Sequence, residues 1–308
     1  MEIQIINSIK QLKILFMENE RIKFSHIQND AIERGKIKRE WFLKLIKSSI
    51  DSKTSELYNN LYIYSPAGLG KTFSVSNFLK ESNVKHVLIT GNTSNFAFGI
   101  QLATIQYMNP NLEEIVVHVD DCDALFATDA SCNAMKKVLD QAKQFVYEKS
   151  MANTINTLND LQRNAIEHFK EEGKMGFCVP THNLKFIFTS NIQLPFDDEV
   201  NIARKTSKYK AIILAHQNAI RSRCKVGDFD LNMEEHWGWL ADVTLSNEFI
   251  KSEDFKIESK IEILNFIWHN WNYLKERSIR LIEKMAITKT QFEDSYQQIW
   301  ELDNLKSR

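Results

Sequence analysis

A short apolar run, a glycine-containing turn and a helix-forming segment follow one another from residue 61, and no other feature constrains the fold of this chain as strongly. The run LYIYS (61–65) predicts a buried strand, and the helical pattern begins at about Lys71. The turn between them reads Ser65-Pro66-Ala67-Gly68-Leu69-Gly70-Lys71-Thr72. In such a strand–turn–helix unit the backbone N–H groups of the turn and of the helix N-terminus cradle phosphate groups. The segment is therefore predicted to be a P-loop.

Each polar position of this loop has an expected role. The ammonium group of Lys71 reaches the β- and γ-phosphates of a nucleotide, and the hydroxyl group of Thr72 binds Mg²⁺. The loop departs from the full pattern at its first position, where Ser65 replaces glycine. This replacement matters only if the backbone there needs a positive φ. Because Gly68, Gly70, Lys71 and Thr72 are all present, we expect the loop to tolerate it.

Further apolar runs predict a parallel α/β sheet. HVLIT (86–90), IVVHV (115–119) and LKFIFTSN (184–191) each have the length of a strand, and helical patterns separate them. Continuous apolar runs of this kind are typical of parallel strands that are buried on both faces. AIIL (211–214) fits either a helix or a strand.

The run IVVHV (115–119) is followed by two carboxylates, Asp120 and Asp121. If this strand lies beside the P-loop strand, Asp120 meets Mg²⁺ directly or through water, and Asp121 polarises the attacking water. An Asp-Asp pair alone is a weak signal, but together with the P-loop it indicates a nucleotide-hydrolysing site. His118, within the strand, is expected to be a packed core residue.

At this point the chain resembles the AAA+ ATPase family over roughly residues 60–290. Phe188-Thr189-Ser190-Asn191 is similar to the family's sensor 1, which implies that Asn191 helps to orient the attacking water. Ala219-Ile220-Arg221-Ser222-Arg223-Cys224 resembles an arginine-finger segment, and its Ser-Arg-Cys part is similar to that of clamp loaders. The resemblance implies that Arg223 acts on the γ-phosphate of a neighbouring subunit, with Arg221 as the alternative. Ser278-Ile279-Arg280 resembles sensor 2, which implies that Arg280 contacts the nucleotide phosphates.

The chain departs from the family's pattern in two places. The second acidic residue of the strand end is aspartate where the family has glutamate, so the carboxylate of Asp121 lies one methylene closer to the backbone. The interval between Asp120 and Asn191 is also long for the family, and the polar segment at about 148–180 is expected to be a helical insertion or hairpin.

The patterns divide the chain into three parts. Residues 1–58 are expected to be an N-terminal helical segment, residues 59–232 the α/β nucleotide-binding domain, and residues 233–308 a small all-helical lid. The expected fold class is therefore α/β, with a parallel-sheet P-loop core of AAA+ type, N-terminal helices and a C-terminal helical lid.

Two segments are candidates for contact with a substrate. The segment from Gly91 to Gly99 is similar to the pore loop of AAA+ protein translocases, although core packing is the preferred interpretation of its Phe96 and Phe98. A stretch without acidic residues fits either a nucleic-acid backbone or a subunit interface that faces the neighbour's nucleotide. Its basic residues are Arg204, Lys205, Lys208, Lys210, Arg221, Arg223 and Lys225. A collar like the one that follows the lid in clamp loaders is not expected, because few residues of the sequence remain after the predicted lid.

Composition excludes several other classes. The net charge is −1, which argues against a generally basic nucleic-acid coat. The four cysteines form no C-x-x-C pair, so a zinc site or a disulfide framework is not expected. No stretch is as apolar as a membrane helix requires, so we expect a cytoplasmic protein without membrane contacts.

Two functions follow as expectations. The preferred one is an ATP- and Mg²⁺-dependent hydrolase that remodels or translocates a protein or a nucleic acid as a homo-oligomer, in a hexamer or another ring. The alternative is a nucleotide-gated assembly protein with slow turnover, such as a clamp-loader-like or helicase-loader-like replication protein.

Overall fold

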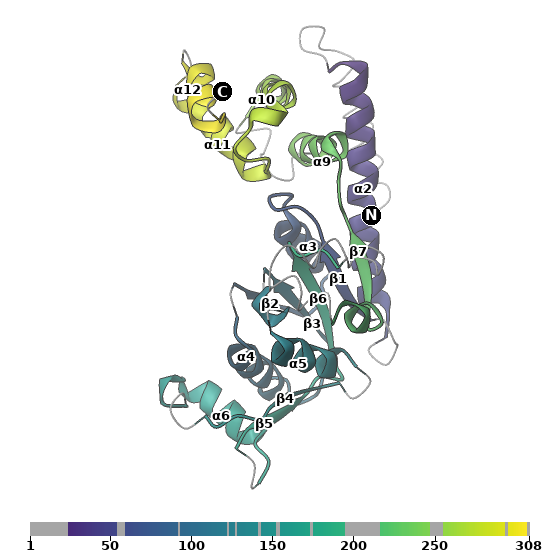
Figure 1. The fold of residues 1–308 in the computed structure, drawn as a ribbon, viewed down its shortest axis with the longest axis vertical. Helices are drawn as coiled ribbons and strands as arrows, with labels where there is room; N and C mark the ends of the chain where they lie inside the picture. Colours follow the sequence, from purple (N-terminus) through teal and green to yellow (C-terminus); the bar gives the residue numbers. More distant parts are fainter. Residues whose placement is uncertain are drawn as a thin grey trace. The chain divides into compact units, whose positions relative to one another are not determined.

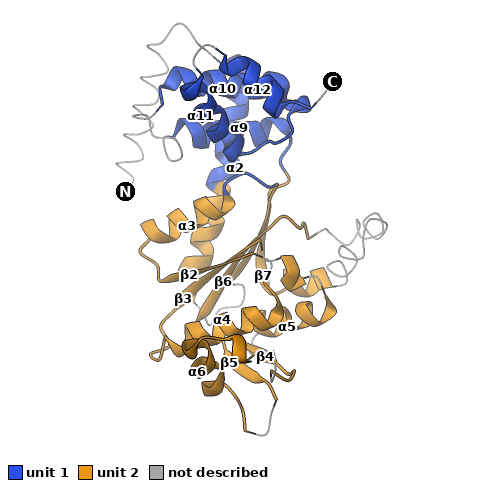
Figure 2. Ribbon diagram, turned by 90° about the vertical axis from the view of Figure 1, so that its left-hand side faces the viewer, with its two compact units in different colours: residues 1–40, 67–70, 231–308 blue, residues 41–66, 71–230 orange. Residues whose placement is uncertain are grey.

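The computed structural model describes residues 24–53, 59–91, 93–121, 123–126, 128–140, 143–151, 155–172, 175–194, 216–246, 255–292 and 295–306. The chain forms two compact units (Figure 2): unit 1 contains residues 1–40, 67–70 and 231–308, and unit 2 contains residues 41–66 and 71–230. Helix α2 (His26–Asp51) contributes residues to both units. The two units divide the N-terminal segment after Glu40, whereas the sequence predicted a single segment over residues 1–58. The division into three parts stays a prediction.

Unit 2 is built around a five-stranded parallel sheet with the strand order β2-β3-β6-β1-β7 (Figure 1). The strands are β1 (Asn60–Tyr64), β2 (His86–Thr90), β3 (Ile115–Asp120), β6 (Leu184–Ser190) and β7 (Cys224–Asp228). Every residue of the inner strands β3 and β6 is buried, which is why their sequences are continuous apolar runs. The predicted α/β fold class is confirmed.

Strand β7 was not predicted from the sequence. It reads Cys224-Lys-Val-Gly-Asp and lies at the edge of the sheet next to β1. Its five residues include a lysine, a glycine and an aspartate, so it lacks the apolar run that marks the others, including β2 at the opposite edge. The ammonium group of Lys225 donates hydrogen bonds to the carbonyl oxygen of Ser48 and to the hydroxyl oxygen of Ser52.

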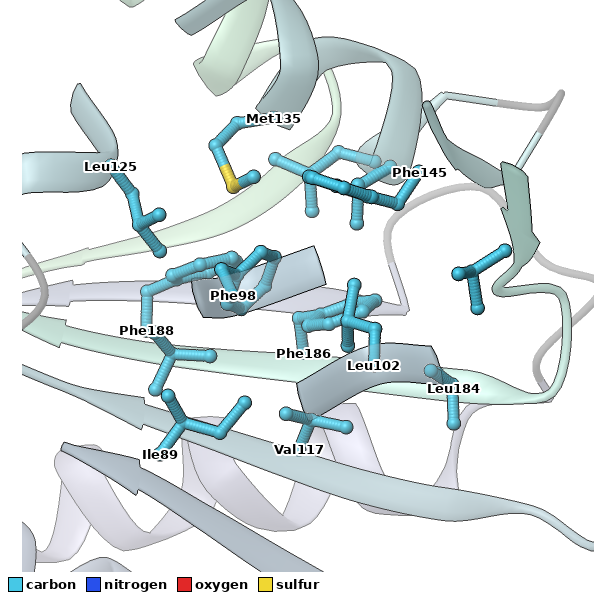
Figure 3. Close-up of a cluster of buried hydrophobic side chains, with 14 of the residues drawn as sticks. Ile89, Phe98, Leu102, Val117, Leu125, Met135, Phe145, Leu184, Phe186 and Phe188 are labelled. Carbon is cyan, nitrogen blue, oxygen red and sulfur yellow. The ribbon is translucent and has the colours of Figure 1, made fainter. Parts of the chain in front are cut away.

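Helices α3 (Lys71–Glu81), α4 (Asn95–Tyr107) and α5 (Asp129–Leu139) complete the main layers of unit 2. In the core, Phe186 and Phe188 of β6 face Phe98 of α4 and Met135 of α5 (Figure 3). The side chain of Phe98 is fully buried. Because Phe98 lies in a helix and fills the core, the packing interpretation of this residue is confirmed, and the pore-loop interpretation is wrong for it.

The expected helical insertion is only partly helical. Strands β4 (Gln144–Tyr147) and β5 (Phe177–Pro180) form a two-stranded antiparallel sheet, and η2 (Ile155–Thr157) and α6 (Asp160–His168) lie between them. Each strand has four residues, which is too short to be recognised in the sequence. Phe145 and Val179 pair with each other and are both buried, which attaches the small sheet to the core.

Unit 1 is all-helical among its described residues, as predicted for the C-terminal region. Its elements, besides the first part of α2, are α9 (Met233–Leu245), α10 (Ile257–Asn270), η4 (Trp271–Tyr273), α11 (Ile279–Gln291) and α12 (Tyr296–Asn304). None of the described helices is long and apolar enough to cross a membrane. Ion pairs join α2 to α9, between Arg39 and Asp242 at 2.9 Å and between Lys38 and Glu235 at 3.2 Å.

Glycines make this helix pair possible. A Cβ atom at Gly238 of α9 would lie 1.8 Å from the carbonyl oxygen of Ala31 in α2, and one at Gly35 would lie 2.1 Å from the backbone of Gly238. Two helices approach this closely only where a side chain is missing. The pair of glycines therefore sets the distance between α2 and α9.

We expect Gly238→Ala to destabilise unit 1 by about 1–3 kcal/mol, because the added methyl group forces the backbones apart. Urea unfolding followed by tryptophan fluorescence measures this, since five of the six tryptophans lie in unit 1: Trp237, Trp239, Trp268, Trp271 and Trp300. Glu283→Ala, at an exposed position of α11, is the control. Equal midpoints for the two variants would contradict the close-packing argument.

A second stability prediction concerns His236 of α9. Burial lowers the pKa of its imidazole from 6.5 to about 4, and Nε2 lies 3.1 Å from the carbonyl oxygen of Arg277. The folded state therefore keeps this group neutral while the unfolded chain takes up a proton, so stability falls as the pH falls from about 6.5 towards 4. Between pH 8 and pH 5 the loss from this residue is about 2 kcal/mol.

His236→Gln retains an N–H donor but does not titrate. Its stability should fall less than that of the wild type between pH 8 and pH 5, by about that same 2 kcal/mol. Urea unfolding of both proteins at the two pH values supplies the comparison. A pH dependence that the substitution leaves unchanged would rule out His236 as the titrating group.

Candidate functional site

The carboxyl ends of three neighbouring strands carry the polar residues singled out in the sequence. Strand β6 pairs with β1 on one side and with β3 on the other. The turn that follows β6 therefore lies between the end of β1, where the P-loop begins, and the end of β3, where the two aspartates lie. Parallel strands bring these ends to one edge of the sheet, which is where open α/β sheets bind ligands.

Lys71, at the first position of α3, is buried at this edge. Its ammonium group donates hydrogen bonds to the carbonyl oxygen of Ser65 at 2.8 Å and to the side-chain oxygen of Asn191 at 2.9 Å. Burial lowers the pKa of Lys71 to about 8, although the nearby charges of Asp121, Asp120 and Asp123 act in the opposite direction. The site thus holds a cation that is poorly solvated and close to three carboxylates.

Asp120, at the end of β3, receives two hydroxyl hydrogen bonds. Thr72 donates to Oδ2 at 2.7 Å, and Thr189 of β6 donates to Oδ1 at 2.5 Å. His118 supports the second contact, since its Nε2 lies 3.0 Å from the hydroxyl oxygen of Thr189. Because that hydroxyl group already donates to Asp120, Nε2 of His118 carries the proton and donates in turn.

Burial lowers the pKa of His118 to about 4, so the ring is neutral. The expectation that His118 is a core residue is confirmed, since its side chain is 1% exposed. It also takes part in the hydrogen-bond chain that orients Asp120, and the sequence did not indicate this.

Asp121 follows the strand with a φ of +51°. Its backbone N–H donates to the carbonyl oxygen of Thr189, and its side chain accepts a hydrogen bond of 2.9 Å from Nδ2 of Asn191. Asn191 therefore bridges the ammonium group of Lys71 and the carboxylate of Asp121. Aspartate adopts the left-handed region more readily than most residues do. This gives a physical reason for aspartate at a position where the family that the chain resembles has glutamate.

The substitution at the start of the P-loop leaves the backbone undisturbed. Ser65 is absent from the residues with a positive φ in the described part of the chain, and its N–H donates to the carbonyl oxygen of Ser190. No glycine is needed there. Gly68 differs, because its φ is +86° and a Cβ atom would lie 2.2 Å from the Cβ of Ser278. Its carbonyl oxygen accepts a hydrogen bond from the N–H of Ile279 at 2.8 Å.

The oxygen atoms of Thr72 and Asp120 suit a magnesium ion. Mg²⁺ takes oxygen ligands, and it is usually held by one or two protein groups together with substrate phosphates and water. A hydroxyl and a carboxylate oxygen 2.7 Å apart fit that arrangement. Among the described residues no group of three or more His, Cys, Asp or Glu side chains is arranged to hold a metal ion without such help.

The predicted finger residues make contacts within their own chain. Nη2 of Arg223 lies 2.8 Å from Oδ2 of Asp140, the residue that ends α5, and Nη1 donates to the carbonyl oxygen of Ala219. Arg221 donates to the carbonyl oxygen of Leu194. A role for Arg223 in a neighbouring subunit stays a prediction.

Arg280 and the basic stretch are the remaining candidates. Arg280 is exposed at the second position of α11, in unit 1, and its predicted role at the phosphates stays untested. Four members of the basic stretch lie outside the described residues: Arg204, Lys205, Lys208 and Lys210. So does the segment 211–214.

Comparisons with known proteins find similarity among solved structures only. A scan against sequence models of protein families finds no match, and neither does a comparison with curated proteins. Among solved structures, the replication initiator DnaA bound to AMPPCP and single-stranded DNA is similar at 15% identity and a TM-score of 0.42, over 84% of this chain and 63% of that one. A mutant of Thermotoga maritima RuvB is similar at 13% identity and a TM-score of 0.43, over 88% of this chain and 70% of that one.

The fold itself follows from the geometry of this chain. The loop of residues 65–72 leaves one strand of a parallel sheet and enters a helix at Lys71, and the neighbouring strands end at Asp120 and Ser190. The chain thus has a P-loop α/β fold with an all-helical C-terminal region, and this is the fold that the AAA+ resemblance of its motifs implies.

Proposed function

We propose that this chain binds ATP with Mg²⁺ and hydrolyses it at the carboxyl edge of the parallel sheet. The observation that carries the proposal is the bridge from Lys71 through Asn191 to Asp121, beside the paired oxygen atoms of Thr72 and Asp120. A cation for the phosphates, oxygen ligands for a metal ion and an exposed carboxylate thereby lie within one hydrogen-bonded network.

The proposed roles follow from the chemistry of each group. The backbone N–H groups of residues 65–72 and of the first turn of α3 bind the phosphates, and Lys71 neutralises their charge. Thr72 and Asp120 hold Mg²⁺, which supplies positive charge to the phosphate oxygens when it is bound. Asp121 would accept a hydrogen bond from the attacking water, and Asn191 would help to orient that water.

The proposal extends to a ring of copies of this chain. Arg223 would act on the nucleotide of a neighbouring subunit, and in doing so it would exchange Asp140 for the γ-phosphate. Arg280 would contact the phosphates from unit 1. The substrate that such a ring remodels or translocates is a protein or a nucleic acid.

The geometry of Asp121 favours the alternative function, a nucleotide-gated assembly protein. The carboxylate of Asp121 is short, and its hydrogen bond to Asn191 occupies one of its oxygen atoms. A carboxylate held in this way polarises water less effectively than a longer, free one. Binding of ATP would then hold an assembly together while turnover stays slow.

Substitutions at Lys71 and Asp121 separate binding from hydrolysis. We expect Lys71→Ala to abolish ATP binding, because no other lysine lies in the loop. Asp121→Asn should bind ATP and Mg²⁺ normally and lose turnover by roughly 10²-fold or more, because it removes the acceptor for the water proton. Fluorescent-nucleotide titration and phosphate release measure the two effects.

Asp160→Ala, at an exposed position of α6, is the matched control and should behave as the wild type does. A Lys71→Ala protein with wild-type affinity would contradict the P-loop assignment. Undiminished phosphate release by Asp121→Asn would favour a different base. Nucleotide binding without turnover in the wild type itself would select the assembly alternative.

The finger prediction is tested by mixing variants. If Arg223 acts on a neighbour, Arg223→Ala should slow hydrolysis by roughly 10³-fold, the lower end of what a finger contributes. Wild-type activity should also rise more than linearly with protein concentration. Arg223→Ala still supplies an intact nucleotide site, and Lys71→Ala still supplies a finger, so mixtures should regain activity that neither variant has alone.

The contact between Arg223 and Asp140 demands its own control. Asp140→Ala removes the same ion pair but leaves the guanidinium group in place. If Arg223 is a finger, Asp140→Ala retains turnover. If both variants lose activity and stability equally, the pair is a structural link of unit 2, and Arg221 is the next residue to test.

A further inference from the structure

A third carboxylate lies beside the candidate site, and the proposed function assigns it no role. Asp123 begins the short helix η1 (Asp123–Phe126), which follows the end of β3. Its side chain accepts a hydrogen bond of 2.7 Å from the hydroxyl group of Ser190, the last residue of β6. Asp123 thus connects the ends of two neighbouring strands.

The same hydroxyl group holds the turn after β6. The backbone N–H of Ile192 donates to the hydroxyl oxygen of Ser190 at 2.9 Å. The hydroxyl group of Ser190 therefore donates to Asp123 and accepts from the N–H of Ile192. Asn191 lies between Ser190 and Ile192 in the sequence. The backbone that carries Asn191 is tied down through a side chain that Asp123 orients.

The position of Asp123 is fixed because η1 is anchored in the hydrophobic core. Leu125 and Phe126 are buried, and the ring of Phe126 packs edge-on against Tyr62 of β1 at 5.8 Å and Phe188 of β6 at 5.7 Å between centroids. Burial raises the pKa of Asp123, and the charges of Asp121 and Asp120 raise it further, while Ser190 and Lys71 lower it. The carboxylate thus belongs to the electrostatic environment of the site.

We propose that Asp123 is a positioning residue: through Ser190 it fixes the turn that places Asn191 between Lys71 and Asp121. The proposal rests on the proposed function for its effect on hydrolysis, but the contact that it assigns exists without nucleotide. A misplacement of about 1 Å in a catalytic group costs on the order of 10²-fold in rate. Loss of the Asp123 acceptor should therefore reduce turnover rather than binding.

The first experiment observes Asn191 directly. The protein is labelled with ¹⁵N-asparagine, and the side-chain amide signals of Asn191 are assigned by their loss in Asn191→Ser. Asp123→Ala should shift these signals and speed their hydrogen exchange. Asp123→Asn keeps an oxygen acceptor for Ser190 and should restore the wild-type spectrum. Asp160→Ala, which removes an exposed aspartate, should leave it unchanged.

The second experiment measures kinetics on the same proteins. Asp123→Ala should lower kcat by roughly 10- to 100-fold while its affinity for a fluorescent ATP analogue changes less than about threefold. Ser190→Ala removes the tie from its other end. It should have the same effect, and the double variant should be no slower than either single one. Ser190→Ala also serves if Asp123→Ala fails to fold.

The outcomes distinguish the two proposals. Unchanged Asn191 signals in both Asp123→Ala and Ser190→Ala overturn the positioning role, whatever the wild type does with ATP. So does a wild-type kcat in both variants. Wild-type protein that binds no nucleotide overturns the proposed function, and with it the catalytic effect of Asp123. Shifted signals together with lower kcat, unchanged affinity and rescue by Asp123→Asn support the positioning role.

Discussion

A buried ammonium group is the constraint on which the edge of the sheet depends. The Lys71 side chain lies out of water, and burial alone would make its charged form costly, which is why its pKa falls to about 8. The charge is retained because carbonyl oxygens and the amide oxygen of Asn191 surround it and aspartates lie nearby. These hydrogen-bond partners come from two segments, so the loop after β1 and the turn after β6 must meet at one point for this lysine to be accommodated.

The two aspartates at the end of β3 differ in how firmly their side chains are held. Asp120 accepts hydroxyl hydrogen bonds from both neighbouring segments and is almost fully buried, so its orientation is set. Asp121 is exposed and lies in the left-handed region of backbone conformation. This conformation stores some strain, which proteins usually retain at functional positions. The choice of aspartate rather than glutamate here follows from the backbone as much as from the chemistry of the side chain.

Arg223 fits both a structural role and the predicted role of an arginine finger. Arg223 neutralises Asp140, a carboxylate at the C-terminal end of α5, where the helix dipole disfavours negative charge. A cation is needed at that point for a structural reason alone. The same arginine matches the finger segment in the sequence, because the ion pair and the motif require the same type of residue.

The sequence by itself determined the local elements and their polar ends. Apolar runs identified β1, β2, β3 and β6, and the loop from Ser65 to Thr72, the pair Asp120-Asp121 and Asn191 were recognised because short-range patterns reflect local backbone requirements. Only the tertiary structure decided that β6 lies between β1 and β3, and therefore that Asn191 bridges Lys71 and Asp121. It also decided that Phe98 belongs to the core, that Cys224–Asp228 is an edge strand, and that Asp123 supports Ser190. Contacts of this kind join residues far apart in the chain, and their energy depends on burial and on neighbours that no local pattern specifies.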